Sequence, residues 1–183
     1  FNVAVFRSKQ NDVGVAIPGQ AISGQPGSQA YRSSGDGSTV EGFEIELVGQ
    51  IAEGLNLHTS YTQAEAKDAS GAAMNTLHPR KQARALLSYQ FSGTWQGLRL
   101  GAGMSWQSEI HNFARSPTGT RRVRQGSYAL ADLMARYRFA GGLQAQLNVR
   151  NLFDRAYYSQ VGFYSQAWWG EPRNVQLLLS YAF

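Results

Sequence analysis

The chain contains no cysteine, so it can form neither a disulfide framework nor a thiolate metal site. It has no run of about 18 apolar residues, as a membrane-spanning helix would need, and its mean hydropathy is −0.35. Lysine is scarce, because only Lys9, Lys67 and Lys81 stand among 17 cations and the rest are arginines. These absences exclude a helical membrane protein, but they leave a membrane β-barrel open, since its strands are only half apolar.

Apolar and polar residues alternate through most of the chain. Near the end, Val175, Leu177, Leu179 and Tyr181 are separated mostly by small or polar residues, which is the period of two of a strand with one apolar face. The opposite face of such strands is rich in Gln, Asn, Ser, Thr and Arg. The same alternation predicts strands within residues 1–7, 40–51, 55–62, 83–91, 98–107, 129–139, 143–150 and 175–183.

Short and long connections alternate between these strands. The short ones cover residues 52–54, 92–97 and 140–142, and the long ones cover 9–39, 64–82, 108–127 and 154–172. Outer-membrane barrels are built this way, with short periplasmic turns and long outer loops. Aromatic residues near the strand ends, such as Tyr61, Trp106 and Tyr137, fit an aromatic girdle at the lipid interfaces, although the core of a soluble sandwich could mimic it.

Five motifs then carry a family resemblance. They are A-V-F-R-S-K-Q-N from Ala4, V-E-G-F-E-I-E-L from Val40, Y-A-L-A-D-L-M-A-R-Y from Tyr128, N-L-F-D-x-x-Y from Asn151, and G-x-P-R from Gly170 before a closing strand that ends in Phe183. In this order and spacing they resemble the barrel of TonB-dependent outer-membrane receptors of the siderophore type. The resemblance runs the length of the chain.

The resemblance implies an all-β, antiparallel transmembrane barrel of about 22 strands, of which residues 1–183 supply about the last eight. Because such a protein must be exported and Phe1 opens directly in a strand, we expect a C-terminal part that lacks the plug domain and the N-terminal strands. The implied function is uptake of a ferric siderophore across the Gram-negative outer membrane, with no directly bound cofactor.

The resemblance also implies partners. They are outer-membrane lipid and lipopolysaccharide, the receptor's own plug and remaining strands, the TonB-ExbB-ExbD system acting on the plug, and the barrel assembly machinery, for which the terminal Phe183 looks like the signal. No nucleic-acid partner is expected. The alternative architecture is a small self-contained eight-stranded barrel that pairs its first strand with its last and acts as an anchor or adhesin.

His58 and Ser60 lie two apart on one polar face, and with Asp132 they are the candidates for a catalytic site. Nucleophilic catalysis needs a serine next to a base that a third group orients, and nothing marks that third group. We therefore expect no catalytic residue and a lumen histidine at position 58. His78 and His111 lie in loops without ligand spacing, so no metal site is expected.

Two sets of loop residues are candidates for ligand binding. The basic set would attract an anionic chelate, or would contact lipopolysaccharide or merely be solvated, and consists of Arg115, Arg121, Arg122 and Arg124. The aromatic set would form a binding surface or cap the barrel rim, and consists of Phe113, Phe163, Tyr164, Trp168 and Trp169.

The motif residues near the C-terminus are interpreted as structural, and they are Asn151, Phe153, Asp154, Arg173 and Phe183. Asp154 and Arg173 could pair across the closing hairpin and pin its register. The charged residues of the polar strand faces would be costly against lipid, so they are expected to line a lumen where they pair with each other and with the plug.

Overall fold

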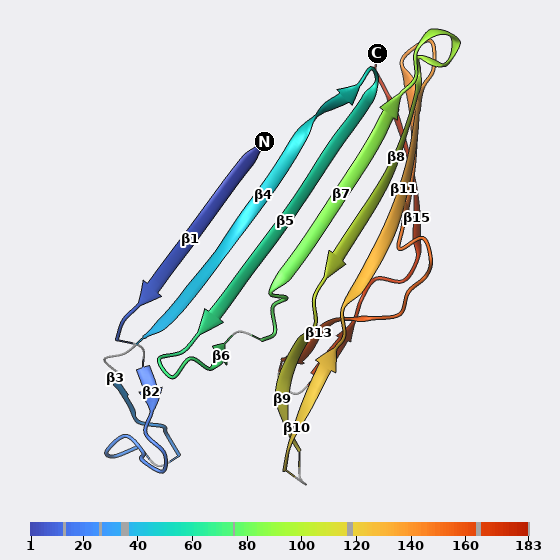
Figure 1. Cartoon of the computed structure of the whole chain (residues 1–183). Helices are drawn as coiled ribbons and strands as arrows, with labels where there is room; N and C mark the ends of the chain where they lie inside the picture. The colour runs from blue at the N-terminus through green and yellow to red at the C-terminus, as the bar shows by residue number, and fades with distance from the viewer. Residues whose placement is uncertain are drawn as a thin grey trace. The chain divides into compact units, whose positions relative to one another are not determined.

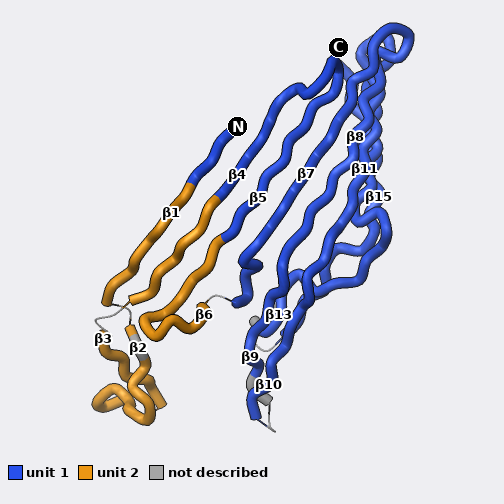
Figure 2. Tube along the Cα trace, viewed as in Figure 1, with its two compact units in different colours: residues 1–4, 44–63, 76–183 blue, residues 5–43, 64–75 orange. Residues whose placement is uncertain are grey.

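A computed structural model of the chain contains the strands that the alternation of apolar and polar residues predicts (Figure 1). The structure describes residues 1–12, 14–25, 27–33, 37–74, 76–116, 119–163 and 166–182, and within these ranges it describes the side chains of all but Val15, Arg115, Ser116 and Phe163. The chain divides into two compact units (Figure 2). Unit 1 holds residues 1–4, 44–63 and 76–183, and unit 2 holds residues 5–43 and 64–75.

Unit 1 is organised around an eight-strand path in the order β1-β4-β5-β7-β8-β11-β12-β15. The strands are β1 (Asn2–Gln10), β4 (Ser38–Ala52), β5 (Leu55–Lys67), β7 (Lys81–Gln90), β8 (Leu98–Gln107), β11 (Tyr128–Arg138), β12 (Leu143–Arg150) and β15 (Asn174–Tyr181). From β5 onward each neighbour pairs antiparallel. The strands agree with the eight predicted from the sequence within a few residues at their ends.

The register places apolar residues beside apolar residues. Leu133 lies opposite Ala102 on β8 and opposite Val149 on β12. On the other face, Arg136 lies between Arg99 and Gln146. The sheet therefore has one apolar face and one face of amides and guanidinium groups, which is the pattern expected of lipid and lumen walls.

Three of the four expected long connections lie in unit 1 at least in part, and two of them carry hairpins of their own. One consists of β9 (Ile110–Ser116) and β10 (Gly119–Gln125), and the other of β13 (Tyr158–Phe163) and β14 (Gln166–Trp169). They lie at the same end of the sheet (Figure 1). The short connections lie at the opposite end, and one contains a 3-10 turn, η1 (Gly93–Trp95).

Little of this unit is a dry core. Among the described residues the buried apolar side chains are Ile110, Tyr128 and Val161, and they lie on β9, β11 and β13. The sheet's apolar face is instead exposed, as at Leu133, Leu177 and Leu179. A soluble sandwich would bury that face, so the structure favours the barrel wall over the sandwich. No helix formed by the described residues is long and apolar enough to cross a membrane.

Unit 2 contains the remaining ends of β1, β4 and β5 with three short strands, β2 (Gly14–Ala16), β3 (Tyr31–Ser33) and β6 (Ala73–Met74). β2 pairs with β3, and β6 pairs with the end of β5. Arg7 forms a 2.9 Å ion pair with Glu41. In the turn before β6, the Ser70 hydroxyl and the Ala72 amide donate to the Asp68 carboxylate and lower its pKa.

Candidate functional site

A groove on the lumen face contains the residues considered for catalysis. His58 Nε2 lies 3.0 Å from Glu46 Oε1, and both residues line a cavity of about 600 Å³ together with Ser60 and Asp132. Asp132 is on β11, three strands away from His58 on β5, which is about 14 Å at the usual strand spacing. It is too far to orient the imidazole. The described residues therefore assemble no serine-histidine-aspartate relay.

The Asp132 carboxylate has a structural partner instead. The backbone N–H of Asn151 donates to Asp132 Oδ1 at 2.9 Å. The buried Asn151 amide donates to the carbonyl oxygens of Arg155 and Glu171 and accepts from the Arg155 N–H. Its backbone has a φ of 48°, a left-handed conformation that Asn tolerates better than most residues. Asn151 thus closes the turn after β12.

Asp154 contacts Arg173 through the backbone of the arginine. The Asp154 carboxylate accepts the backbone N–H of Arg173 at 2.8 Å. The contact joins the N-L-F-D turn to the segment before β15. Gly170 of the G-x-P-R motif belongs to the same junction, because an added Cβ there would overlap the ring of Tyr157. The Phe153 side chain is exposed.

The hairpins β9–β10 and β13–β14 form what we call the outer platform. Ile110 and Val161 are 1% and 0% exposed, and Asn112 Nδ2 donates to the Gly162 carbonyl oxygen at 2.8 Å. Gly162 has a φ of 73°. Tyr128 and Tyr157 stack with ring centroids 4.4 Å apart. The two hairpins therefore pack against each other through a small buried core, although they lie far apart in the sequence.

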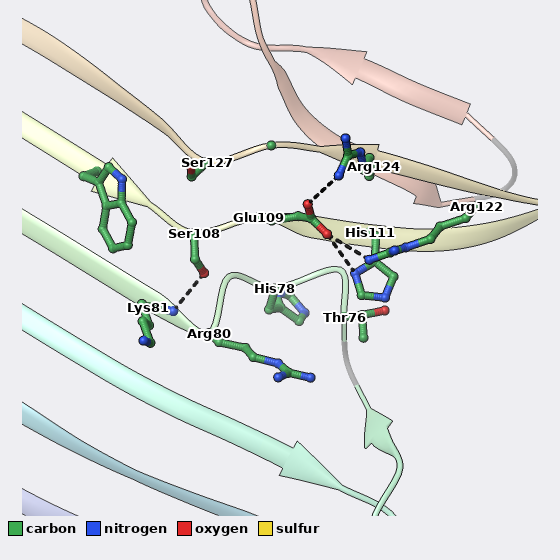
Figure 3. A pocket seen from close by; sticks show the side chains of 12 residues that line it. Thr76, His78, Arg80, Lys81, Ser108, Glu109, His111, Arg122, Arg124 and Ser127 are labelled. Atoms are coloured by element: carbon green, nitrogen blue, oxygen red, sulfur yellow. Dashed lines mark hydrogen bonds and ion pairs between the residues drawn. The ribbon is translucent and has the colours of Figure 1, made fainter.

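A second feature, which we call the rim cleft, lies where β7 and β8 meet the outer platform (Figure 3). Its volume is about 840 Å³, and its charged lining is Arg80, Lys81, Glu109, Arg122 and Arg124, with His78 and His111. Glu109 lies 2.8 Å from Arg122 and 3.2 Å from Arg124, from opposite carboxylate oxygens. Two guanidinium groups thus share one carboxylate, and cations outnumber acidic groups among the lining residues that the structure describes.

His111 lies in this cleft, partly buried and close to its charged groups. Its Nδ1 lies 3.9 Å from Glu109 Oε1, and its side chain is 23% exposed. Burial lowers the pKa of His111 below its ordinary value of 6.5, and the nearby charges of Arg122 and Arg80 lower it further against the opposing effect of Glu109. Both effects favour the neutral form of the imidazole.

The aromatic candidates lie on the outer platform. Trp168 and Trp169 on β14 are 52% and 66% exposed, and Trp169 stacks on Tyr158 with centroids 4.3 Å apart. The Ser159 hydroxyl donates to the carbonyl oxygens of both tryptophans. Phe113 on β9 is exposed and lies edge to face with His111. Tyr164 and Phe183 lie outside the described residues, as does the side chain of Phe163.

The basic candidates divide between two faces of the β9–β10 hairpin. Arg122 and Arg124 lie opposite Phe113 and His111, whereas Arg121 lies opposite Ala114 on the other face. The side chain of Arg115 lies outside what the structure describes. The structure brings Arg122 and Arg124 together around Glu109, which the sequence reading did not single out. Alternation along β9 and β10 was the signal available, because it puts His111 and Arg124 on one face.

Among the described residues there is no group of three or more His, Cys, Asp or Glu side chains that could hold a metal ion. His78 and His111 do line one cleft, but arginines surround them.

The comparisons with known proteins agree with this geometry. The model of the TonB dependent receptor-like β-barrel family matches residues 1–152. The chain belongs to this family of receptors, and its place is the bacterial outer membrane.

The relatives are siderophore receptors. The chain is 36% identical over 149 residues to the ferripyoverdine receptor of Pseudomonas aeruginosa, covering 79% of this chain and 18% of that protein. It is 33% identical over 186 residues to the ferric-pyoverdine BN7/BN8 receptor of Pseudomonas putida, covering 100% of this chain and 20% of that protein. The chain therefore spans about a fifth of the length of these relatives.

Solved structures give the same fold. The pyoverdine outer membrane receptor FpvA of Pseudomonas aeruginosa, bound to pyoverdine, superposes with a TM-score of 0.86 at 31% identity, covering 99% of this chain and 27% of that one. The ferric-catecholate import receptor Fiu of E. coli superposes with a TM-score of 0.76 at 25% identity, covering 97% of this chain and 24% of that one.

Proposed function

We propose that residues 1–183 form the C-terminal barrel strands and outer loops of a receptor for TonB-dependent uptake of a ferric siderophore. The observation that carries the proposal is the outer platform. Its exposed tryptophans are held by loops that are packed against each other, at the end of a sheet with one apolar and one polar face. A ligand that meets such a surface finds aromatic groups already in place, so little conformational entropy is lost on binding.

The ligand class follows from the family and from the chemistry of the platform. The relatives are named for ferric pyoverdines and for ferrioxamine B, and Trp168 and Trp169 offer flat apolar faces suited to a large chelate. The proposed contact set is completed by Phe113, Phe163, Tyr164, Arg115, Arg121, Arg122 and Arg124. We expect the chain to bind the chelate as cargo and to perform no chemistry on it.

The test uses the full-length receptor with Trp168→Ala and Trp169→Ala, singly and together. Because tryptophans at the centre of an interface often dominate binding energy, each loss should weaken binding of its ferric siderophore about tenfold or more. Ferric pyoverdine and ferrioxamine B serve as two probes, with binding followed by fluorescence quenching and uptake by radiolabelled iron.

Trp95→Ala is the matched control. Trp95 is also an exposed tryptophan, but it lies in η1 at the end of the sheet that carries the short turns. Its replacement should leave the affinity unchanged. Equal effects of Trp95→Ala and Trp169→Ala, or no effect of either platform variant on either probe, would contradict the proposed ligand surface.

The polar sheet face suits a plug domain in the rest of the receptor. Arg99, Arg136 and Arg138 line a cavity of about 840 Å³ together with Gln90 and Gln144, and no acidic residue lies among its lining residues in the described part of the chain. Acidic groups of a plug would compensate these arginines. We propose that TonB-ExbB-ExbD acts through that plug.

The edges of the sheet support a larger barrel. In the described residues β1 pairs only with β4, and β15 pairs only with β12. Because an unpaired strand edge in lipid leaves backbone groups unsatisfied, we propose further strands that bring the total to about 22. The barrel assembly machinery would read the closing strand with Phe183, which lies outside the described residues.

A further inference from the structure

Strand β13 carries two bulges where it pairs with β14, the strand of the two exposed tryptophans. The register between the strands shifts once on each side of the pair Gln160–Val161. The extra residues at these shifts are Ser159 and Gly162. A bulge bends its strand and re-aims the neighbouring side chains. The direction in which the tryptophans project therefore depends on how the two bulges are held.

The bulge at Gly162 is held by a side chain of the other outer hairpin. Asn112 Nδ2 on β9 donates to the Gly162 carbonyl oxygen at 2.8 Å, and Asn112 Oδ1 accepts the Phe113 N–H at 2.8 Å. A Cβ added at Gly162 would overlap the Asn112 side chain, and the φ of 73° there favours glycine. Because the ladder leaves the extra residue of a bulge unpaired, Asn112 supplies a partner from a different hairpin.

The start of β13 is held by the same hairpin. The Tyr158 N–H donates to Gln125 Oε1 on β10 at 2.8 Å, and Gln125 Nε2 donates to the Gly126 carbonyl oxygen at 2.9 Å. Between the two amide contacts, Val161 of β13 and Ile110 of β9 are buried. Strand β13 is therefore fixed near both ends by amide side chains of the β9–β10 hairpin.

The tryptophan strand takes its orientation from β13. Among the described strands, β14 pairs with β13 alone. At the other bulge, the Ser159 hydroxyl donates to the carbonyl oxygens of Trp168 and Trp169 at 3.2 and 3.3 Å, and the Trp169 ring stacks on Tyr158. A change at Asn112 thus reaches both tryptophans through the backbone of β13, without any contact between Asn112 and a ligand.

We propose that Asn112 is a positioning residue for ligand binding, because it sets the β13 bulge that aims Trp168 and Trp169. Gln125 supports the same strand from its start. The inference rests on the function proposed above, in which the tryptophans contact the ferric chelate. The affinity of one outer loop is then determined in part by a residue of another loop.

The experiment removes only the bond from Asn112 to Gly162. Asn112→Asp keeps the shape of the side chain and the oxygen that accepts from Phe113, but it has no N–H for the glycine carbonyl. In the full-length receptor it should weaken binding of ferric pyoverdine or ferrioxamine B about fivefold. With Trp168→Ala and Trp169→Ala already present, the same change should cost less than about twofold, since it acts through those rings.

Two further variants control for charge and for the loss of an asparagine. Asn112→Ala adds no charge and should behave as Asn112→Asp. Asn56→Ala should leave the affinity unchanged, although the Asn56 amide also donates to a glycine carbonyl, that of Gly54 at 3.3 Å, because this contact lies at the short-turn end of the sheet. Equal losses from both Asn112 variants with and without the tryptophans would overturn the proposal, since Asn112 would then act independently of them.

A measurement without ligand separates this inference from the function on which it rests. Fluorine NMR of receptor labelled with 5-fluorotryptophan reports the surroundings of each ring, and Trp169→Phe identifies the Trp169 resonance. Asn112→Asp should shift that resonance and leave the resonance of Trp95 unchanged. An unchanged Trp169 resonance would overturn the positioning role. A shifted resonance would retain that role even if neither tryptophan variant altered binding, an outcome that contradicts only the proposed ligand surface.

Discussion

Glu109 determines how the rim cleft presents its positive charge. One carboxylate oxygen contacts Arg122 and the other contacts Arg124, so two long flexible side chains are held side by side. Surface ion pairs of this kind contribute little to stability, typically below about 1 kcal/mol each. The effect of Glu109 is therefore on geometry, because it prepares an arginine pair for an anion at small entropic loss.

At the residue scale, His111 gives a pH-dependent readout of the cleft. Its folded-state pKa lies below its ordinary value of 6.5, so the unfolded chain binds the proton more readily. The stability linked to this histidine is thus fully present above pH 6.5 and is lost as the pH falls through the folded-state pKa. Arg122→Gln should raise that pKa, because it removes a neighbouring positive charge.

NMR of ring-labelled histidine in the full-length receptor measures this titration. His111→Gln identifies the resonance by its disappearance, and Arg121→Gln, on the other face of β10, should leave the midpoint where it is. A wild-type midpoint at or above 6.5 would show that the field around His111 is not positive.

Gly170 tests the junction between the N-L-F-D and G-x-P-R segments. An added Cβ would overlap the aromatic ring of Tyr157, and Tyr157 stacks on the buried Tyr128, so the ring cannot move without disturbing the platform core. Gly170→Ala should destabilise the full-length receptor by about 1 to 3 kcal/mol in urea unfolding. At Gly126 an added Cβ would meet open space, so Gly126→Ala should be nearly neutral. Equal unfolding midpoints for the two variants would refute the junction.

At the scale of elements, the strands were predictable and the platform was not. Period-two alternation identifies β4, β8 and β12, because one face of each strand suits lipid and the other suits water. The hairpins β9–β10 and β13–β14 lie in segments that the sequence predicts to be loops. The alternation of apolar and polar residues is interrupted there, and the segments are rich in Gly, Ser and Arg. What orders them is long-range, as in the bond from Asn112 to Gly162. Local sequence patterns carry no information about a partner 50 residues away.

The assignment of the two sheet faces can be tested on adjacent residues of β11. Leu133 lies between Ala102 and Val149 and is 44% exposed on the apolar face. Leu133→Arg should lower the free energy of unfolding in lipid by about 2 to 4 kcal/mol. Met134, one residue on, lines the lumen-side groove with Asp132 and Asn148, so Met134→Arg has water and a carboxylate nearby and should cost much less. Comparable losses in both variants would mean that the faces are wrongly assigned.

At the scale of the whole molecule, the described residues concentrate their buried side chains at one end. The sheet has little dry core of its own, and its apolar face is exposed along β11, β12 and β15. Such a sheet is stable only where lipid covers that face and other strands pair with its edges. The outer platform, by contrast, is packed internally by Ile110, Tyr128 and Val161. The sheet thus needs lipid against its apolar face, whereas the outer platform is ordered by its own internal contacts.

The proposed further strands give the last prediction. If residues 1–183 are produced alone and refolded into lipid vesicles, the edges at β1 and β15 expose backbone N–H and C=O groups to hydrocarbon, at several kcal/mol for each unsatisfied group. The isolated chain should therefore aggregate or associate through these edges, and it should not migrate as a compact heat-modifiable monomer on gels. The full-length receptor refolded in parallel should do so. A stable monomer of the isolated chain, with β1 cross-linking to β15 through introduced cysteines, would instead establish the closed eight-stranded barrel.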